Sequence, residues 1–167
     1  MNIKLFALKS ERMRIQKFLD TAPLFALYVA YARILGDFQK HLASERVHFL
    51  QALILTGLFF EERPVRPTEM AATFGVSRSN LSHALRELEK RGWIERKLSP
   101  ADARAYLFSL SREGRKKVPR LIKIFDATQE EMERATGGKR IAPQLKRFIE
   151  IYQGAQGVLS PAPRLGL

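Results

Sequence analysis

The segment from residue 77 to residue 91 carries the clearest chemical signal in this 167-residue sequence. Its polar side chains donate and accept hydrogen bonds, and they recur at intervals of three, one, three and four residues: Ser79, Ser82, His83, Arg86 and Lys90. On a helix this spacing gives one polar face. The apolar positions fall on the opposite face: Leu81, Ala84, Leu85 and Leu88. Such a helix can pack on a core with one side and offer donors and acceptors to base edges with the other.

The start of this helix adds a second kind of contact. Ser77 is a favoured N-cap residue, and Arg78, Ser79 and Asn80 follow it in the first turn. Unpaired N–H groups at a helix N-terminus bind phosphate. The simpler alternative is the solvated face of an ordinary surface helix, which would be favoured if the helix stood alone. That alternative must also account for the segments on either side.

The neighbouring segments complete a recognisable order. Pro67 predicts the start of a short helix, and Gly75 predicts its end in a left-handed conformation. Gly92 predicts the end of the helix capped by Ser77. Two strands are then expected, at 93–98 and 106–110, joined by a turn at 99–104. The order of helix, short helix, tight turn, helix and β-hairpin is that of a winged helix-turn-helix, so the fold is expected to be mainly α with a small β-hairpin wing.

The hairpin is basic. Arg96, Lys97 and Arg104 are expected on or near its tip, where they suit a minor groove and its flanking phosphates. Asp102 lies two residues before Arg104. Its carboxylate is expected to orient the Arg104 guanidinium. The alternative is that Asp102 only caps the turn and that Arg104 is solvated.

The run from Ser77 to Gly114 resembles the MarR family of winged helix-turn-helix transcriptional regulators. Four motifs carry the resemblance in order: Leu88-Glu89-Lys90-Arg91-Gly92, Ile94-Glu95-Arg96, Asp102-Ala103-Arg104 and Leu110-Ser111-Arg112-Glu113-Gly114. Weaker agreement extends over 47–132. Family members often have Thr-Arg where this chain has Ser82-His83, which leaves the base preference open. The segment before Thr21 is also longer than in many members.

The resemblance implies a homodimer that binds a pseudo-palindromic double-stranded DNA operator and regulates transcription. Dimerisation helices are then expected at 1–43, a DNA-binding lobe at 44–115, a linker and further dimerisation helices at 116–153, and a disordered tail at 154–167.

The helices outside the lobe are predicted from apolar spacing. A short helix is expected at 10–19, and a longer one begins near Pro23. The long helix has a wide apolar stripe between Leu24 and Leu42, which a partner chain would cover. A further helix is expected from Ser44 to Phe60. Val118 to Met132 and Ile141 to Tyr152 give two more stripes. Pro119 interrupts the first of these, so that helix either begins after it or bends there.

Composition limits the classes of function. The chain has 29 Lys and Arg against 17 Asp and Glu, a formal net charge of +12, which favours a polyanionic partner. It has no cysteine, which excludes disulfides and zinc–thiolate sites. No signal-peptide core and no membrane span are expected, and the predicted location is the cytoplasm.

Ligand, metal and enzyme hypotheses are weaker. The resemblance implies a small, often aromatic acidic effector, and five residues are candidates for its pocket: Phe25, Tyr28, Tyr31, Arg33 and Phe49. Dimer core is the favoured alternative for them. His41, His48 and His83 lack a clustered carboxylate, so neither a metal site nor a cofactor is expected. No catalytic motif occurs, so an enzyme is not expected.

Two other functions remain open. A protein-interaction module would predict an apolar or acidic exposed helix face, unlike the one seen here. A non-specific architectural DNA-binding protein agrees with a further basic run between 112 and 123: Arg112, Arg115, Lys116, Lys117, Arg120 and Lys123. Salt dependence and specificity ratio would separate this function from a regulator's.

Overall fold

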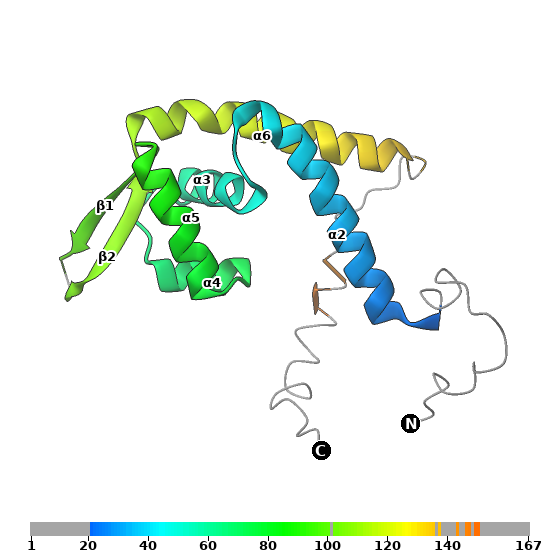
Figure 1. Cartoon of the computed structure of the whole chain (residues 1–167), viewed down its shortest axis with the longest axis horizontal. Coiled ribbons are helices and arrows are strands. Elements are labelled where there is room, and N and C mark those ends of the chain that lie inside the picture. Colours follow the sequence, from blue (N-terminus) through cyan, green and yellow to red (C-terminus); the bar gives the residue numbers. More distant parts are fainter. Residues whose placement is uncertain are drawn as a thin grey trace, which may run out of the picture. The chain divides into compact units, whose positions relative to one another are not determined.

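The computed structural model describes residues 21–100, 102–135, 137, 143, 146–147 and 149–150. Its helices and strands follow in this order: α2 (Pro23–Leu42), the 3-10 turn η2 (Ala43–Glu45), α3 (Phe49–Glu61), α4 (Pro67–Phe74), α5 (Arg78–Lys90), β1 (Ile94–Ser99), β2 (Asp102–Leu110) and α6 (Arg112–Ala135). The chain divides into two compact units on either side of the Ile124–Phe125 bond, within α6. The unit that ends at Ile124 holds the predicted winged helix-turn-helix (Figure 1).

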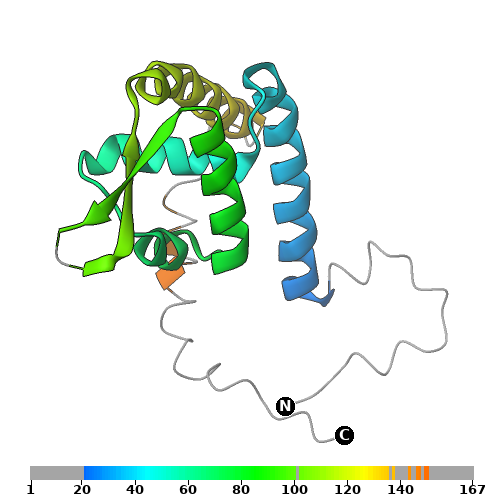
Figure 2. The same cartoon turned by 60° about the vertical axis from the view of Figure 1, so that its left-hand side comes forward.

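Apolar helix faces build the core of this unit. The α3 side chains Ile54 and Leu55 are fully buried, as are Leu81 and Leu88 of α5. Burial of each such side chain contributes about 1.5–3 kcal/mol. Figure 2 shows α3 crossing behind α5 and the hairpin, and α3 contacts both of them. The alternation of apolar and polar positions along α5 therefore fixes which of its faces points outward.

The connection between α2 and α3 differs from the prediction. A helix was expected from Ser44, but α3 begins at Phe49, because Arg46 adopts a left-handed conformation with φ 55° after the η2 turn. Gln39 of α2 closes the gap. Its side-chain nitrogen donates to the Val47 carbonyl at 3.0 Å, and its side-chain oxygen accepts from the Phe49 backbone N–H at 3.1 Å. A contact between residues ten apart sets this boundary, so local pattern did not reveal it.

The hairpin is longer than predicted. The strands pair antiparallel, and the predicted turn at 99–104 largely belongs to them: β1 continues through Ser99, and β2 begins at Asp102 rather than at Tyr106. The register jumps between Leu98↔Tyr106 and Ser99↔Asp102, so three β2 residues face no partner residue on β1. Such an irregularity is typical of a β-bulge.

A third extended segment joins this hairpin and was not predicted. Val65, in the loop between α3 and α4, forms an antiparallel bridge with Phe108 of β2. Both backbone hydrogen bonds are made, at 2.8 and 2.9 Å. The loop between the helices is thereby attached to the inner strand of the wing.

The start of α6 is confirmed in detail. The Ser111 hydroxyl accepts from the Gly114 N–H at 3.0 Å and donates to the Gly92 carbonyl at 2.6 Å. Gly114 is required there, because a Cβ would lie 1.9 Å from the Trp93 carbonyl oxygen. Pro119 lies inside α6, so the helix does not begin after it.

Parts of the prediction lie outside the described residues. These are the helix expected at 10–19 and the tail at 154–167. Of the helix expected from Ile141 to Tyr152, the described residues 143, 146–147 and 149–150 are helical.

Candidate nucleic-acid interface

Helix α5 presents the polar face that the sequence predicts. Its four apolar residues are buried, with exposures of 5% or less: Leu81, Ala84, Leu85 and Leu88. Its other face is exposed: Arg78, Ser79, Asn80, Ser82, His83, Arg86 and Lys90. The face is not uniformly cationic, because Lys90 donates to Glu87 at 3.0 Å and thereby lowers the pKa of that carboxyl. Arg86 makes no ion pair among the residues described, so its guanidinium is available to a ligand.

The N-terminus of α5 is held by its predicted cap. The Ser77 hydroxyl accepts from the Asn80 backbone N–H at 3.2 Å. Gly75 lies two residues before Ser77 and has φ 63°. This left-handed residue ends α4 and turns the chain into α5. The first turn of α5 is exposed, with cationic Arg78 and hydroxyl-bearing Ser79 on it.

A groove that sequence reasoning missed lies beside this face. It has a volume of about 330 Å³, and the start of α3 and the middle of α5 line it. His48 and His83 come together there with Asn80 and Arg91. His48 lies 35 positions before His83 in the sequence, so no local spacing could have indicated the groove.

The wing places its cations unevenly. Lys97 and Arg104 are exposed, and Arg104 lies near the tip. Arg96 does not lie at the tip, which corrects the prediction: it pairs across the middle of the hairpin with Phe108. Its Nε lies 2.9 Å from the Glu89 carboxylate of α5, and its guanidinium lies 4.9 Å from the centre of the Tyr106 ring. Arg96 therefore connects the wing to α5.

Asp102 makes a contact with the backbone instead of orienting a guanidinium. Its carboxylate accepts from the Arg104 backbone N–H at 3.0 Å, as in an Asx-turn. Within the described hairpin, no ion pair joins the Asp102 and Arg104 side chains. Of the two alternatives for this pair, the structure shows the turn cap.

A second basic cluster lies at the other end of α5. Trp93 has the Arg91 guanidinium 5.0 Å and the Lys117 ammonium 5.2 Å from its ring centre. Lys117 also contacts the Glu45 carboxylate at 3.2 Å, and Arg120 approaches the same group at 3.8 Å. Part of the basic run on α6 therefore stabilises the fold. Arg112, Arg115 and Lys123 are exposed.

The candidate effector residues do not surround one cavity in this chain. Phe25, Tyr28 and Tyr31 lie exposed on α2, at 54%, 69% and 58%. Arg33 is also exposed, whereas Phe49 packs edge-on against Phe38 with ring centres 5.7 Å apart. Tyr28 and Tyr31 belong to the stripe for which a partner chain was predicted, whereas Leu42 at the end of that stripe is buried within this chain.

Among the described residues, no group of three or more potential metal ligands gathers in one place. None of the described helices is long and apolar enough to cross a lipid bilayer.

Comparison with known proteins gives a family match over part of the chain. Residues 48–105 match the family model described as MarR family. The transcriptional repressor MprA of Escherichia coli (strain K12) is 39% identical over 84 residues, which cover 50% of this chain and 48% of the repressor. The chain thus matches about half the length of this curated relative.

Solved structures extend the likeness beyond that segment. The repressor CouR bound to a 23-mer DNA duplex has a TM-score of 0.70 and 25% identity, over 85% of this chain and 99% of the CouR chain. CouR from Rhodococcus jostii RHA1 bound to p-coumaroyl-CoA has a TM-score of 0.68 and 25% identity, over 79% and 92%. These relatives are transcriptional regulators rather than enzymes, and their fold is the predicted winged helix-turn-helix.

Proposed function

We propose that this chain, whose residues 48–105 match the MarR family model, is a transcriptional regulator that binds a pseudo-palindromic double-stranded DNA operator as a homodimer. The observation that carries this proposal is the exposed polar face of α5, placed beside a basic hairpin. At 1.5 Å per residue α5 is about 20 Å long, a size that suits the major groove. The described groups on that face include both donors and acceptors, as direct contact with base edges requires.

The parts of the interface have different roles in this proposal. Ser79, Ser82, His83 and Arg86 contact base edges, because they occupy the outward face of α5. Lys97 and Arg104 of the wing contact the minor groove or its phosphates, and so bind DNA of any sequence. Arg96 positions the wing against α5, given its contacts with Glu89 and Tyr106.

The dimer is proposed from the exposed face of α2. Exposed aromatic and aliphatic side chains follow one another along this helix: Phe25, Leu27, Tyr28, Tyr31 and Ile34. A contiguous apolar surface of this kind is typical of an interaction site. A second copy of the chain would cover it and place two α5 helices on one side of a duplex. Sedimentation of the full chain should give a dimer, and Tyr28→Asp with Tyr31→Asp should give a monomer.

The deciding experiment is selection of bound duplexes from a random pool at near-physiological salt. A regulator of this kind should recover a pseudo-palindrome with half-sites about 10 base pairs apart or a multiple of that. Arg86→Ala should alter the recovered motif, while the matched control Arg134→Ala, an exposed cation of α6 outside the winged lobe, should not. Strong binding without a motif would instead favour the architectural alternative.

We further propose that a small-molecule effector controls DNA binding. CouR is described as bound to p-coumaroyl-CoA, which supports a search among aromatic acids and their thioesters. In this chain the five candidate residues are proposed first as dimer core, since three of them are exposed on the α2 surface that dimerisation would cover. Release of the selected operator by such a compound would show that an effector acts on this chain.

A further inference from the structure

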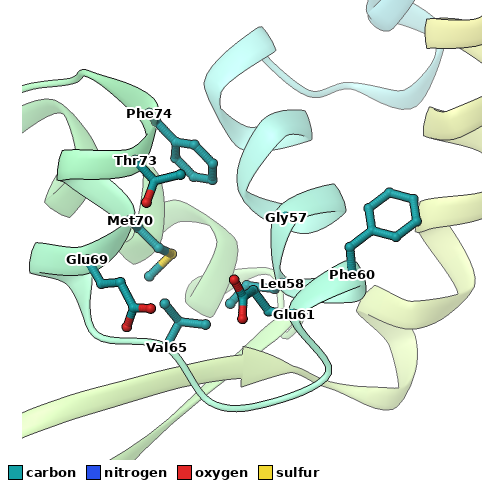
Figure 3. Close-up of a pocket in the computed structure, with 9 residues that line it drawn as sticks. All are labelled: Gly57, Leu58, Phe60, Glu61, Val65, Glu69, Met70, Thr73 and Phe74. Atoms are coloured by element: carbon teal, nitrogen blue, oxygen red, sulfur yellow. The ribbon is translucent and has the colours of Figure 1, made fainter. Parts of the chain in front are cut away.

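A small, largely apolar cavity that opens to the surface lies between α3 and α4 of the winged lobe, apart from the polar face of α5. Its volume is about 250 Å³. Apolar side chains form most of its wall, among them Leu58 of α3, Val65 of the connecting loop, and Met70 and Phe74 of α4. Figure 3 shows these side chains together with the carboxylates of Glu61 and Glu69. The cavity is slightly smaller than most ligand pockets, and it has their usual apolar lining with few polar groups.

The two helices approach each other closely at one wall of this cavity. Gly57 faces the Phe74 ring, and a Cβ at that position would lie 2.9 Å from the ring's Cζ. The absence of a side chain at Gly57 lets the ring lie against α3. Glu62 ends α3 in a left-handed conformation, with φ 56°, and the chain then continues to Val65, which lines the cavity.

The ionisable groups that line the cavity are both acidic. Glu61 and Glu69 lie in its wall, and no Lys or Arg does. One guanidinium outside the wall shows that the two carboxylates can share a cation. Arg63 Nε lies 3.1 Å from Glu61, and its terminal nitrogens donate to Glu69, one of them at 3.4 Å. A planar cation therefore fits between the two acids, beside an apolar chamber.

We propose that this cavity binds a small apolar molecule that carries an ammonium or amidinium group. The apolar body fills the space between Met70 and Phe74, and the cation replaces the Arg63 guanidinium between Glu61 and Glu69. An anionic molecule of the same shape is disfavoured, because its charge would face two carboxylates. A neutral one gains only the apolar contacts.

Occupancy would reach the DNA-contacting elements through direct contacts. α4 packs against α5, and the loop at Val65 is hydrogen-bonded to Phe108 in the wing. A ligand that separates α3 from α4 therefore moves α4, on which α5 packs, and the Val65 loop, to which the wing is bonded. This coupling rests on the proposed function, whereas the binding site itself does not.

The test compares three probes of one shape by calorimetry on the DNA-free full chain: 2-naphthylmethylamine, 2-naphthylmethanol and 2-naphthoate. The cationic probe should bind about tenfold more tightly than the neutral one, as expected for hydrogen bonds to charged groups, and the anion should not bind. Glu69→Gln should remove the preference for the cation. Arg63→Gln should tighten cation binding, because it removes the internal competitor, an effect that a merely structural role would not produce.

A matched pair of variants locates the site. Thr73→Phe adds a ring to the cavity wall, while Ala72→Phe adds it at the adjacent exposed position outside the wall. Loss of probe binding in the first alone supports the proposal. Equal binding of the three probes, binding that survives Thr73→Phe, or no binding by the folded wild-type chain overturns it. A bound probe that leaves DNA affinity unchanged overturns only the coupling, and failure of the chain to bind DNA leaves the calorimetric result intact.

Discussion

Val65 and Phe108 exchange two backbone hydrogen bonds, with the Val65 N–H donating at 2.8 Å and the Phe108 N–H at 2.9 Å. The two residues belong to the loop before α4 and to the inner strand of the wing. The pairing ties the helix-turn-helix to the hairpin by backbone atoms, which side-chain substitutions leave in place. The position of the wing relative to α5 is accordingly a property of the fold, and single substitutions can test each contact that supports it.

Gly114→Ala should destabilise the protein by about 2 kcal/mol or more, because the new Cβ would lie 1.9 Å from the Trp93 carbonyl oxygen and the backbone would have to shift. Gly36→Ala in the middle of α2 is the control. A Cβ there has no atom within 4 Å, so alanine should raise stability by about 0.5–1 kcal/mol through helix propensity. Urea denaturation of both variants gives the comparison, and equal stabilities would contradict the close approach at Gly114.

Ser77→Ala should lower stability by about 1 kcal/mol, because it removes the acceptor of the Asn80 backbone N–H at the start of α5. The control is Ser79→Ala, an exposed serine in the first turn of the same helix, which removes no capping bond. Thermal denaturation followed by circular dichroism measures both. Equal losses of stability in the two variants would show that the cap contributes nothing.

Arg104→Ala should weaken binding to every duplex by a similar factor and should reduce the slope of log affinity against log salt by about one. Arg86→Ala and His83→Ala should instead change the preference among sequences, by about 1–3 kcal/mol for each hydrogen-bonded base pair that the side chain no longer reads. Titration of one selected and one scrambled duplex at several salt concentrations separates the two effects. Wild-type affinity in Arg104→Ala would exclude the wing from the interface.

Arg96 and Glu89 should show a coupling of about 0.5 kcal/mol in a double-mutant cycle of stability, since their ion pair lies at the surface. Arg96→Lys should retain part of the charge attraction but lose the planar group that lies 4.9 Å from the Tyr106 ring centre. Its DNA affinity should therefore fall below that of wild type. Additive effects of Arg96→Ala and Glu89→Ala would argue against a link between wing and helix.

Glu69 should titrate below the ordinary range of a glutamate, because the hydrogen bond from Arg63 lowers the pKa of its carboxyl. A lowered folded-state pKa contributes stability above the pH at which glutamates titrate in the unfolded chain. That contribution is lost as the pH falls through the lowered value. NMR titration of the Glu69 side-chain carbon measures this, and Arg63→Gln should return the pKa toward its ordinary value. No change in that variant would mean that another group sets the titration.

Local pattern predicted those elements whose residues are neighbours in sequence. The apolar spacing of α5, its Ser77 cap, the Gly75 turn and the Ser111 cap all depend on groups within four residues of one another, and all are present. Side-chain spacing on a helix is fixed by its 3.6-residue repeat, so the exposed polar face of α5 followed directly.

Contacts between distant segments were decided by the tertiary structure. The start of α3 at Phe49 depends on Gln39, the length of β2 depends on its register with β1, and the anchored position of Arg96 depends on Glu89. The contact of the Phe74 ring with Gly57, beside the cavity between α3 and α4, depends on the packing of two separate helices. The sequence by itself determined which residues face outward on each helix. Only packing decided which outward residues remain free for a ligand and which are held by the fold. Hydrogen bonds and ring contacts between segments far apart in the chain leave no periodic pattern in the sequence, so they could not be predicted from it.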